Sequence, residues 1–546
     1  MKKMSIFLCF SFLLLPFAGC SDSDNGTGES SGGDGVSLED IRVIPLPQFI
    51  SYGRGAFAVD KDVTISCTAA IEDEATLLAG YLKEDHGMEP VVSKDKTDAT
   101  IQLVIDPALT VKAEGGYRIE VANNKIVLTA KDNLGIFYGS QTVRQLITLQ
   151  GNLFVVREVS ISDYPVFSWR SVMLDEARYF KGKEAVKTLL YEMARLKMNT
   201  FHWHLTDDQG WRIEIKKYPK LTSIGGYRNK TIVGYMWDNP TEWDTKRYGG
   251  FYTQEDIKEV VAYAQKRFVN IIPEIEMPGH SLSALAAYPE YSCTGGPFEV
   301  EGRWGVFNDI YCTKEETFKF LQDVLDEVIA LFPSEYIHLG GDEAPRIRWR
   351  NCVHCQKRME QEHLTKEAEL QTYFINRIEN YLNEKGKKII GWDEILEGGI
   401  PQRATVMSWR GEKGGIHAAK AGYDVIMSPN IYMYLNNHQL GVNDKIGIKK
   451  RLISLKKVYD YHPVPAELDK KAALHVKGVQ ANLWTEYLDT AEEFDYSLYP
   501  RMAAVAEVAW SLVENKSYDN FCIRLMDIEK HYDAFGLSYC KMIYDK

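Results

Sequence analysis

The sequence predicts an α/β protein in which a (β/α)8 barrel, the TIM-barrel fold, follows a small α+β domain. The main observation is that eight short apolar segments alternate with segments of helical periodicity across residues 166–546. In residues 37–165 the pattern differs, because short strands of alternating polarity are mixed with amphipathic helices. A chain of 546 residues that is 45% hydrophobic and 26% charged is long enough for both domains.

The N-terminus has the parts of an export signal. An apolar run from Ile6 to Phe17 follows two lysines and leads through small residues to Cys20, an arrangement that resembles the lipobox of bacterial lipoproteins. We therefore expect residues 1–20 to be a lipoprotein signal peptide, whose cleavage leaves Cys20 as the lipid-bearing terminus. Residues 21–36 are rich in Gly, Ser and Asp and are predicted to form a flexible tether.

This signal predicts an exported protein that a lipid anchors to the bacterial envelope, on the periplasmic or the cell-surface side. Plain secretion is the alternative. The net charge of −12 and the lack of a long Lys/Arg block in the sequence argue against a nucleic-acid partner, which would need a basic face.

Strand signals follow in order along the chain. In the first domain, 117–121 and 126–129 alternate as strands do, and a helix is predicted near 136–149. The eight candidate strands of the barrel are 171–174, 200–204, 270–275, 336–339, 388–392, 405–408, 424–427 and 478–483.

Helix signals lie between the candidate barrel strands. Residues 186–193 place their apolar side chains on one face. Thr253 with Asp256, and Thr313 with Glu316, resemble capping boxes at helix starts. Alternating strands and helices also fit a doubly wound open sheet, so the position of the polar residues has to separate the two folds.

Polar and aromatic residues accumulate where the candidate strands end. Barrel enzymes build their active sites from the C-terminal ends of several strands, so this distribution favours the barrel and predicts one shared site. Three tryptophans, two carboxylates and an arginine suit a sugar, whose apolar face stacks on aromatic rings while its hydroxyls need charged partners. The residues at these strand ends are Asp175 to Arg178, His202 to His204 with Asp207 and Asp208, Glu274 to Glu276 with His280, His338 to Glu343, Trp392 to Glu394, Ser408 to Arg410, Tyr432, Tyr434, Asn436, and Trp484 to Glu486.

The predicted catalytic centre is the pair Asp342 and Glu343. Gly340 and Gly341 precede the pair and let the backbone turn sharply at the end of a short apolar strand. A carboxyl group near apolar walls can stay protonated near neutral pH and act as a general acid. Two neighbouring acids can therefore hold different protonation states.

Seven of the nine cysteines fall in the folded part, an odd number, so they cannot all pair with one another. Cys352 and Cys355 form a CxxC, which could be a redox pair, half a metal site or a local disulfide. No second CxxC exists to complete a zinc site. We expect a structural role, with a disulfide permitted by the exported location, and no metal.

Several sequence runs resemble one enzyme family. The run HLGGDE at 338–343 resembles the H-x-G-G-D-E signature of glycoside hydrolase family 20, the β-N-acetylhexosaminidases. The resemblance continues in the family's order with WHLTDDQGWR at 203–212, PEIEMPGH at 273–280, GWDE at 391–394 and NLWTE at 482–486. In the first domain, IPLPQ at 44–48 and GIFYGSQT at 135–142 resemble the family's non-catalytic N-terminal module. The resemblance therefore covers nearly the whole mature chain.

The resemblance implies an exo-acting, retaining β-N-acetylhexosaminidase that releases terminal non-reducing GlcNAc or GalNAc from an oligosaccharide or glycoconjugate. It implies that Glu343 is the general acid/base and that Asp342 orients the substrate's 2-acetamido group. The acetamido oxygen then attacks the anomeric carbon and forms an oxazolinium-type intermediate, so no enzyme nucleophile and no cofactor are expected. Some relatives complete the pocket across a dimer, and a homodimer is therefore one prediction for the partner.

The resemblance also implies roles around the acid pair. Tyr434 is expected to hydrogen-bond the acetamido carbonyl, while Arg178 and Glu486 are expected to hold hydroxyls at the non-reducing end. Asp207 and His280 are expected to support the general acid through charge and hydrogen bonding.

Four further positions complete the implied pocket. The expected walls are Trp392, Trp409 and Trp484. Asn436 stands where some members carry Asp, which bears on the sugar's 6-hydroxyl. Both side chains can accept a hydrogen bond, so substrate preference is expected to change more than activity.

Two other functions are weighed against this interpretation. His202 and His204 form an H-x-H, as metal-dependent hydrolase barrels use, but that motif belongs on the first barrel strand and here it falls on the second candidate. A non-catalytic glycan-binding lipoprotein could use the same aromatic residues to capture sugar. A mere binder needs no pair of Asp342 and Glu343 beside Tyr434.

Overall fold

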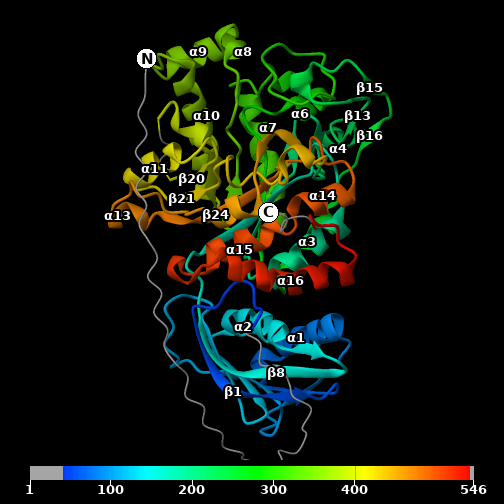
Figure 1. Cartoon of the computed structure of the whole chain (residues 1–546). Coiled ribbons are helices and arrows are strands. Elements are labelled where there is room, and N and C mark those ends of the chain that lie inside the picture. Colours follow the sequence, from blue (N-terminus) through cyan, green and yellow to red (C-terminus); the bar gives the residue numbers. More distant parts are fainter. Residues whose placement is uncertain (1–40, 400, 402, 542–546) are drawn as a thin grey trace, which may run out of the picture. The chain divides into compact units, whose positions relative to one another are not determined.

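The computed structural model describes residues 41–399, 401 and 403–541 (Figure 1). The predicted signal peptide with Cys20 and the predicted tether lie outside the described residues. Within them, a closed eight-stranded parallel barrel follows an α+β domain, which confirms the predicted fold class. No helix in the described ranges is both long enough and apolar enough to cross a membrane.

The first domain is one mixed sheet with two helices on the same face (Figure 1). Its strand order is β1-β8-β5-β6-β4-β2-β3, with β7 paired to β8. Tyr117, Ile119 and Val121 alternate with exposed residues along β5, so one face of this strand packs in the core. The elements are β1 (Phe49–Val59), β2 (Thr64–Cys67), α1 (Glu72–His86), β3 (Val91–Lys94), β4 (Ile101–Ile105), β5 (Tyr117–Ala122), β6 (Lys125–Ala130), α2 (Asn133–Leu146), β7 (Thr148–Gln150) and β8 (Leu153–Asp163).

The predicted helix near 136–149 is α2, with different ends. It begins earlier because the side chain of Asp132 accepts a hydrogen bond of 2.9 Å from the N–H of Gly135 and caps the helix. It ends at Leu146 because Thr148–Gln150 pairs with β8 as β7.

The eight predicted barrel strands all form and close into one ring. The order around the barrel is β10-β17-β18-β19-β20-β21-β24-β9, and every neighbouring pair is parallel. Because β24 pairs with β9, the open-sheet alternative is wrong. The strands are β9 (Trp169–Asp175), β10 (Thr200–His204), β17 (Asn270–Glu274), β18 (Tyr336–His338), β19 (Lys388–Trp392), β20 (Thr405–Ser408), β21 (Val425–Met427) and β24 (Val476–Leu483).

Helices follow most of the barrel strands. The predicted capping box of Thr253 and Asp256 is confirmed at the start of α5. The one predicted from Thr313 and Glu316 is wrong, because α7 takes Lys314 as its N-cap residue. The helices are α3 (Lys183–Arg195), α4 (Lys220–Ser223), α5 (Gln254–Gln265), α6 (Leu282–Ala287), α7 (Glu315–Leu331), α8 (Ile347–Arg350), α9 (Val353–Gln361), α10 (Glu367–Glu384), α11 (Lys413–Lys420), α12 (Leu455–Tyr459), α13 (Lys470–Ala473), α14 (Ala491–Leu498), α15 (Arg501–Trp510) and α16 (Tyr518–Phe535).

Long loops at the C-terminal ends of the strands contain short paired strands. The segment from Met236 to Tyr248 contains part of two such pairs. The short strands are β11 (Thr206–Asp207), β12 (Gly210–Trp211), β13 (Tyr227–Arg228), β14 (Thr231–Ile232), β15 (Trp243–Asp244), β16 (Tyr248–Gly249), β22 (Asn437–His438) and β23 (Ile448–Leu452).

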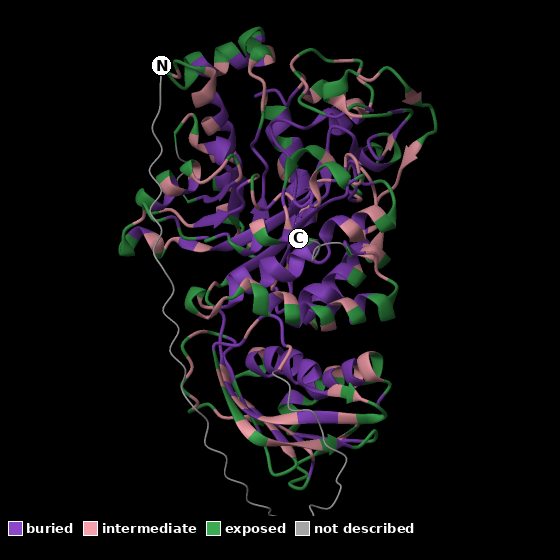
Figure 2. Cartoon of the chain, in the orientation of Figure 1, coloured by how far each residue is buried: buried purple, intermediate pink, exposed green. Residues whose placement is uncertain are grey.

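Burial follows the layers of the fold, since Figure 2 shows buried barrel strands and outer helices with an exposed side.

One buried ion pair joins the two domains. Lys197, after α3, is fully buried, and its Nζ lies 3.2 Å from Asp163 Oδ2 at the end of β8. The same carboxylate accepts hydrogen bonds of 3.0 Å from Trp510 Nε1 and from the N–H of Gln48.

We predict that Asp163→Ala lowers the free energy of unfolding by about 3 to 5 kcal/mol, because it leaves the Lys197 ammonium buried without its carboxylate. Urea denaturation followed by circular dichroism measures the change. Glu89→Ala is the control, since it breaks an ion pair with Lys83 in which both side chains are mostly exposed, and its midpoint should equal the wild type's. An Asp163→Ala midpoint equal to the control's would contradict the prediction.

Candidate active site

The predicted site residues lie at the C-terminal ends of the barrel strands. Parallel strands in a closed barrel bring these ends to one mouth, so residues far apart in the sequence meet there. Arg178 follows β9, Asp207 lies in β11 just after β10, His280 follows β17, Asp342 and Glu343 follow β18, Trp392 ends β19, Trp409 follows β20, Tyr434 and Asn436 follow β21, and Trp484 and Glu486 follow β24.

A glycine turn presents the two acids. Gly340 and Gly341 have φ angles of +68° and +87°, in a region that residues other than glycine rarely adopt. Glu343 also has a positive φ, +44°. Space also requires glycine here, because a Cβ on Gly340 would lie 1.7 Å from Glu276 Oε2. The turn therefore fixes where Asp342 and Glu343 leave the backbone.

Asp342 and Glu343 lie in different environments. Asp342 is buried, and burial raises the pKa of its carboxyl to about 6, with the charge of Glu343 adding to the shift and His280 opposing it. The Glu343 side chain is 42% exposed, and its interaction with His280 lowers its pKa. The sequence argument placed a protonated acid near apolar walls, and in the structure burial acts mainly on Asp342.

His280 connects the acid pair to a second group of carboxylates. Its Nε2 lies 3.7 Å from Asp342 Oδ2 and 3.6 Å from Glu343 Oε2. Its Nδ1 lies 3.2 Å from Asp207 Oδ1 and 3.0 Å from Asp208 Oδ2. Burial alone would lower the pKa of His280, but these carboxylates raise it well above its usual value. The ring is therefore a cation between two acidic pairs.

Glu274 lies at the centre of a buried polar cluster below the acid pair. Its carboxylate contacts a ring nitrogen of His202 at 3.0 Å and of His338 at 2.8 Å, contacts His204, and accepts a hydrogen bond of 2.8 Å from Trp392 Nε1. Burial would lower the pKa of His204, but Glu274 and Asp207 raise it to about 10. Both ring nitrogens of His204 contact carboxylates, Nδ1 that of Glu274 and Nε2 that of Asp207 at 2.9 Å, so this histidine of the H-x-H takes part in a buried ion-pair network.

Aromatic side chains form one side of the mouth. The rings of Trp409 and Tyr434 are stacked, with centroids 6.0 Å apart and an angle of 15° between their planes. Trp484 lies 6.3 Å from Tyr434 and 6.0 Å from Trp392, centroid to centroid. Trp392 is only 1% exposed, so it supports the wall from behind. Trp409 is held by a hydrogen bond of 2.8 Å from its Nε1 to Glu394 Oε2.

Arg178 joins the aromatic side of the site to the acidic side. Its guanidinium lies 5.0 Å from the centroid of the Trp484 ring. It donates a hydrogen bond of 2.8 Å to Gln209 Oε1, and its Nη2 lies 2.8 Å from Asp207 Oδ2. Burial raises the pKa of the nearby Glu486 to about 7, while Arg178 opposes that shift.

Three of the predicted residues have a buried side-chain oxygen without a hydrogen-bond partner among the described residues, namely Asp342 Oδ1, Glu486 Oε2 and Asn436 Oδ1. Leaving such an atom unpaired costs about 1 to 3 kcal/mol, so each is suited to bind a ligand donor. Asn436 is the predicted residue for which the described contacts give no side-chain link to the others. Its backbone carbonyl accepts a hydrogen bond from the N–H of Ile448.

Four acidic residues of the site have no role that the sequence pattern predicts, namely Asp208, Glu274, Glu276 and Glu394. These four residues lie at the ends of candidate barrel strands, and that position alone indicates a place in the shared site. Their partners come from other strands, and the pattern of a single strand does not name those partners. Glu276 differs from the rest, because neither of its buried oxygens has a hydrogen-bond partner among the described residues, and burial with Asp342 nearby raises its pKa well above the usual value.

Comparison with protein-family models gives two matches. The model of the glycosyl hydrolase family 20 catalytic domain matches residues 167–512, and the model of domain 2 of that family matches residues 40–164. The sequence is 43% identical to a beta-hexosaminidase of Porphyromonas gingivalis over 511 residues, covering 91% of this chain and 64% of the relative. It is 34% identical to a beta-hexosaminidase of Akkermansia muciniphila over 440 residues, covering 80% of this chain and 87% of the relative.

Solved structures show the same similarity. An exo beta-N-acetylglucosaminidase of Vibrio harveyi in complex with N-acetylglucosamine superposes with a TM-score of 0.82 at 32% identity, covering 92% of this chain and 78% of that one. An N-acetyl-beta-hexosaminidase of Streptomyces plicatus in complex with Thio-NAglucal superposes with a TM-score of 0.79 at 30% identity, covering 92% of this chain and 96% of that one.

We predict that Gly340→Ala destabilises the protein, because overpacking against Glu276 costs about 1 to 3 kcal/mol and the left-handed backbone adds about 1 to 2 kcal/mol. Gly80→Ala in α1 is the matched control, since its Cβ would meet nothing within 4 Å and alanine favours helix by up to about 1 kcal/mol. Thermal unfolding should therefore give shifts of opposite sign. A melting temperature for Gly340→Ala at or above the wild type's would refute the steric argument.

Proposed function

The chain belongs to glycosyl hydrolase family 20, and we propose that it is an exo-acting, retaining β-N-acetylhexosaminidase. The observation that supports this most strongly is the turn that holds Asp342 and Glu343 side by side, one buried and one half-exposed, next to aromatic rings. The substrate class is an oligosaccharide or glycoconjugate with terminal β-linked GlcNAc or GalNAc. The curated relatives supply the name of the activity, and the chain spans 64% of the Porphyromonas gingivalis relative.

In the proposed reaction the substrate provides the nucleophile. Glu343 gives its proton to the leaving oxygen while the acetamido oxygen attacks the anomeric carbon, and an oxazolinium-type intermediate forms. Glu343 then takes a proton from water, which opens the intermediate with retention of configuration. Asp342 accepts a hydrogen bond from the acetamido N–H and stabilises the positive charge that develops there. Its unpaired Oδ1 is suited to accept that bond.

Glu343 has to be protonated to act as an acid, although His280 lowers its pKa. A bound sugar would cover the exposed part of the side chain, and burial raises the pKa of a carboxyl group. His280 is in this view a positioning residue, because Asp207 and Asp208 hold its ring toward the acid pair. Asp207 acts on Glu343 through that ring and also by its own negative charge, which opposes the lowering of the Glu343 pKa.

The remaining residues are assigned to binding one terminal sugar. Tyr434 donates its hydroxyl hydrogen to the acetamido carbonyl, and Trp409 and Trp484 enclose the acetamido group and the ring, with Trp392 supporting this wall from behind. Arg178 and Glu486 bind hydroxyls at the non-reducing end, and Asn436 is assigned to the 6-hydroxyl. Since Arg178 is already held by Asp207 and Gln209, it offers its remaining donors in a fixed direction, which closes the site beyond one sugar and favours exo action.

The cellular setting is proposed from the sequence. We infer an exported protein that a lipid on Cys20 anchors to the bacterial envelope, with the site facing periplasmic or extracellular glycans. A homodimer stays a prediction, since the structure holds one chain.

We predict that Glu343→Gln lowers kcat on an aryl β-N-acetylglucosaminide by about 10²- to 10⁴-fold, the usual range for loss of general acid catalysis. The loss should be smaller for aryl groups that leave without a proton, because these need less help from an acid. Binding of N-acetylglucosamine, measured by calorimetry, should change little, which separates an enzyme from a glycan-binding protein.

The control is Glu335→Gln. Glu335 directly precedes the same strand, β18, and pairs with Lys388 while remaining mostly exposed. Its kcat should equal the wild type's. Glu343→Gln with most of the wild-type rate on a poor leaving group would show that another residue is the acid.

We predict that kcat/KM falls as the pH rises above about 6. The acid pair shares one proton over a range that ends at the raised pKa of Asp342, about 6, and above it neither carboxyl can protonate the leaving group. Asp342→Asn should reduce the rate strongly on acetamido substrates and move the alkaline limb of the residual activity to lower pH, because the proton then depends on Glu343 alone. A wild-type profile that is flat from pH 5 to 8 would contradict the shared-proton model.

A further inference from the structure

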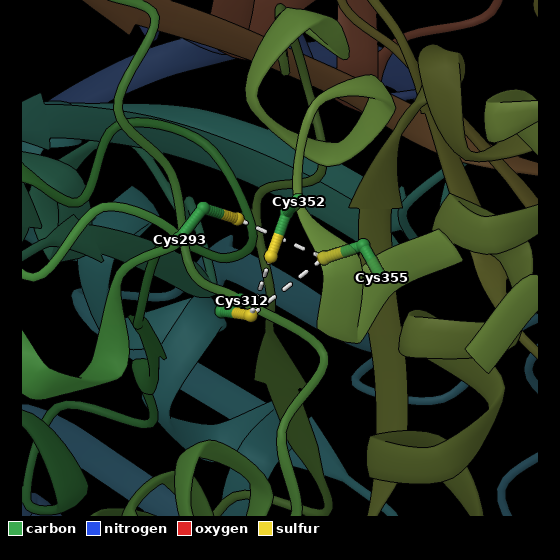
Figure 3. Close-up of side chains that lie close together, drawn as sticks. All are labelled: Cys293, Cys312, Cys352 and Cys355. Carbon is green, nitrogen blue, oxygen red and sulfur yellow. Dashed lines mark hydrogen bonds between the residues drawn. The ribbon is translucent and has the colours of Figure 1, made fainter. Parts of the chain in front are cut away.

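Four cysteines from the segments that follow β17 and β18 meet in one cluster, outside the site described above (Figure 3). Cys293 follows the short helix Pro289–Tyr291, and Cys312 precedes α7. Cys352 and Cys355 lie at the start of α9, where Cys352 is the N-cap residue. All four are free thiols, and three of them are buried. We call these four residues the tetracysteine cluster.

The spacing of the sulfurs is that of a metal site. Sγ of Cys312 lies 3.7 Å from that of Cys352 and 3.6 Å from that of Cys355, and Cys293 Sγ lies 3.7 Å from Cys355 Sγ. Four thiolates around Zn²⁺, each about 2.3 Å from the metal, lie about 3.8 Å from one another at the corners of a tetrahedron. Two disulfides would instead need sulfurs about 2.0 Å apart.

We propose that one structural Zn²⁺ ion is bound by the four thiolates of the tetracysteine cluster. Thiolates in a tetrahedral arrangement select zinc among the common divalent cations. An iron–sulfur cluster fits less well, because its four thiolates are divided among two or four irons, so thiolates on different irons lie farther apart than thiolates that share one metal ion. Binding releases the thiol protons and involves no oxidation or reduction.

This site is not visible as a motif in the sequence, because no second CxxC is present. Only Cys352 and Cys355 have that spacing, whereas Cys293 and Cys312 stand far apart in one long loop. The backbone N–H of Cys312 donates a hydrogen bond of 2.9 Å to the carbonyl of Tyr291, which brings the two ends of that loop together. The complete ligand set therefore exists only in the folded chain.

The proposed ion would tie together the two loops that present the catalytic groups. The loop after β17 contains His280 as well as Cys293 and Cys312, and the segment after β18 contains Asp342 and Glu343 before it reaches Cys352.

Hydrogen bonds already run between these loops beside the cluster. Trp349 Nε1 donates to the Tyr311 carbonyl at 2.8 Å, and the Tyr311 N–H donates to the Pro278 carbonyl at 3.0 Å. A metal ion bound by both Cys312 and Cys352 would hold these two hydrogen-bonded loops together.

The test is the metal content of the full chain, purified without chelators or metal-affinity resin and measured by inductively coupled plasma mass spectrometry. We expect one zinc per chain. Cys312→Ser and Cys352→Ser should lose it, whereas Cys522→Ser, which removes a thiol in α16 outside the cluster, should keep it.

A second measurement covers the case in which the serine variants do not fold. Wild-type protein stripped with a chelator and titrated with Co²⁺ should show the visible absorption of a tetrahedral tetrathiolate site, with an end point at one Co²⁺ per chain, and zinc should displace it. Removal of the metal should also lower the melting temperature.

Two results would overturn the proposal. One is a wild-type chain that binds no stoichiometric zinc or cobalt while its four thiols titrate as free. The other is a mass lower by four hydrogen atoms than that of the fully reduced chain, with peptides that show two disulfides within the cluster. Neither result bears on the hydrolase activity, so the metal site and the proposed function can fail independently.

Discussion

Hydrogen bonding between β24 and β9 closes the barrel, and this closure sets the geometry of the mouth. Leu483 pairs with Leu174, so the chain leaves both strands at the same level. The Thr485 N–H then donates to Asp175 Oδ2 at 3.1 Å, and the guanidinium of Arg178 comes to lie over Trp484. In an open sheet these first and last strands would be separated by the full width of the sheet, and the arginine could not face the tryptophan.

Closure of the barrel also brings acidic side chains together in the buried interior. The negative charge of each carboxylate is neutralised in a different way. Asp207 is surrounded by Arg178, His204 and His280, which keep its pKa low. No ion pair within 4.0 Å involves Glu276 in the described part of the chain, and burial raises its pKa, so it is expected to hold a proton. Removing one partner from a buried ion pair is costly, which links these residues to stability as well as to chemistry. The protonation of the acid pair is therefore set by the whole cluster around it.

Much of this arrangement could be predicted from the sequence, because strand periodicity and the residues at strand ends are local properties. The barrel strands and the shared mouth follow from them. Properties that depend on contacts across the fold could not be predicted. Burial acts on Asp342 more than on Glu343 because of neighbours from other strands, Lys314 replaces Thr313 as the N-cap of α7, and the partners of the CxxC lie in a distant loop.

The ammonium of Lys197 makes the two domains depend on each other, because its carboxylate partner, Asp163, lies at the end of the first domain. A fragment that began at the barrel would contain this cation and the Trp510 ring beside it, but neither the Tyr117 hydroxyl that it binds nor the carboxylate that neutralises it. Domain exchange between homologues, or trimming of the chain for crystallisation, would meet the same obstacle. The first domain therefore completes the buried interior of the barrel domain. A first domain taken from a homologue would have to place an acidic residue at the position of Asp163.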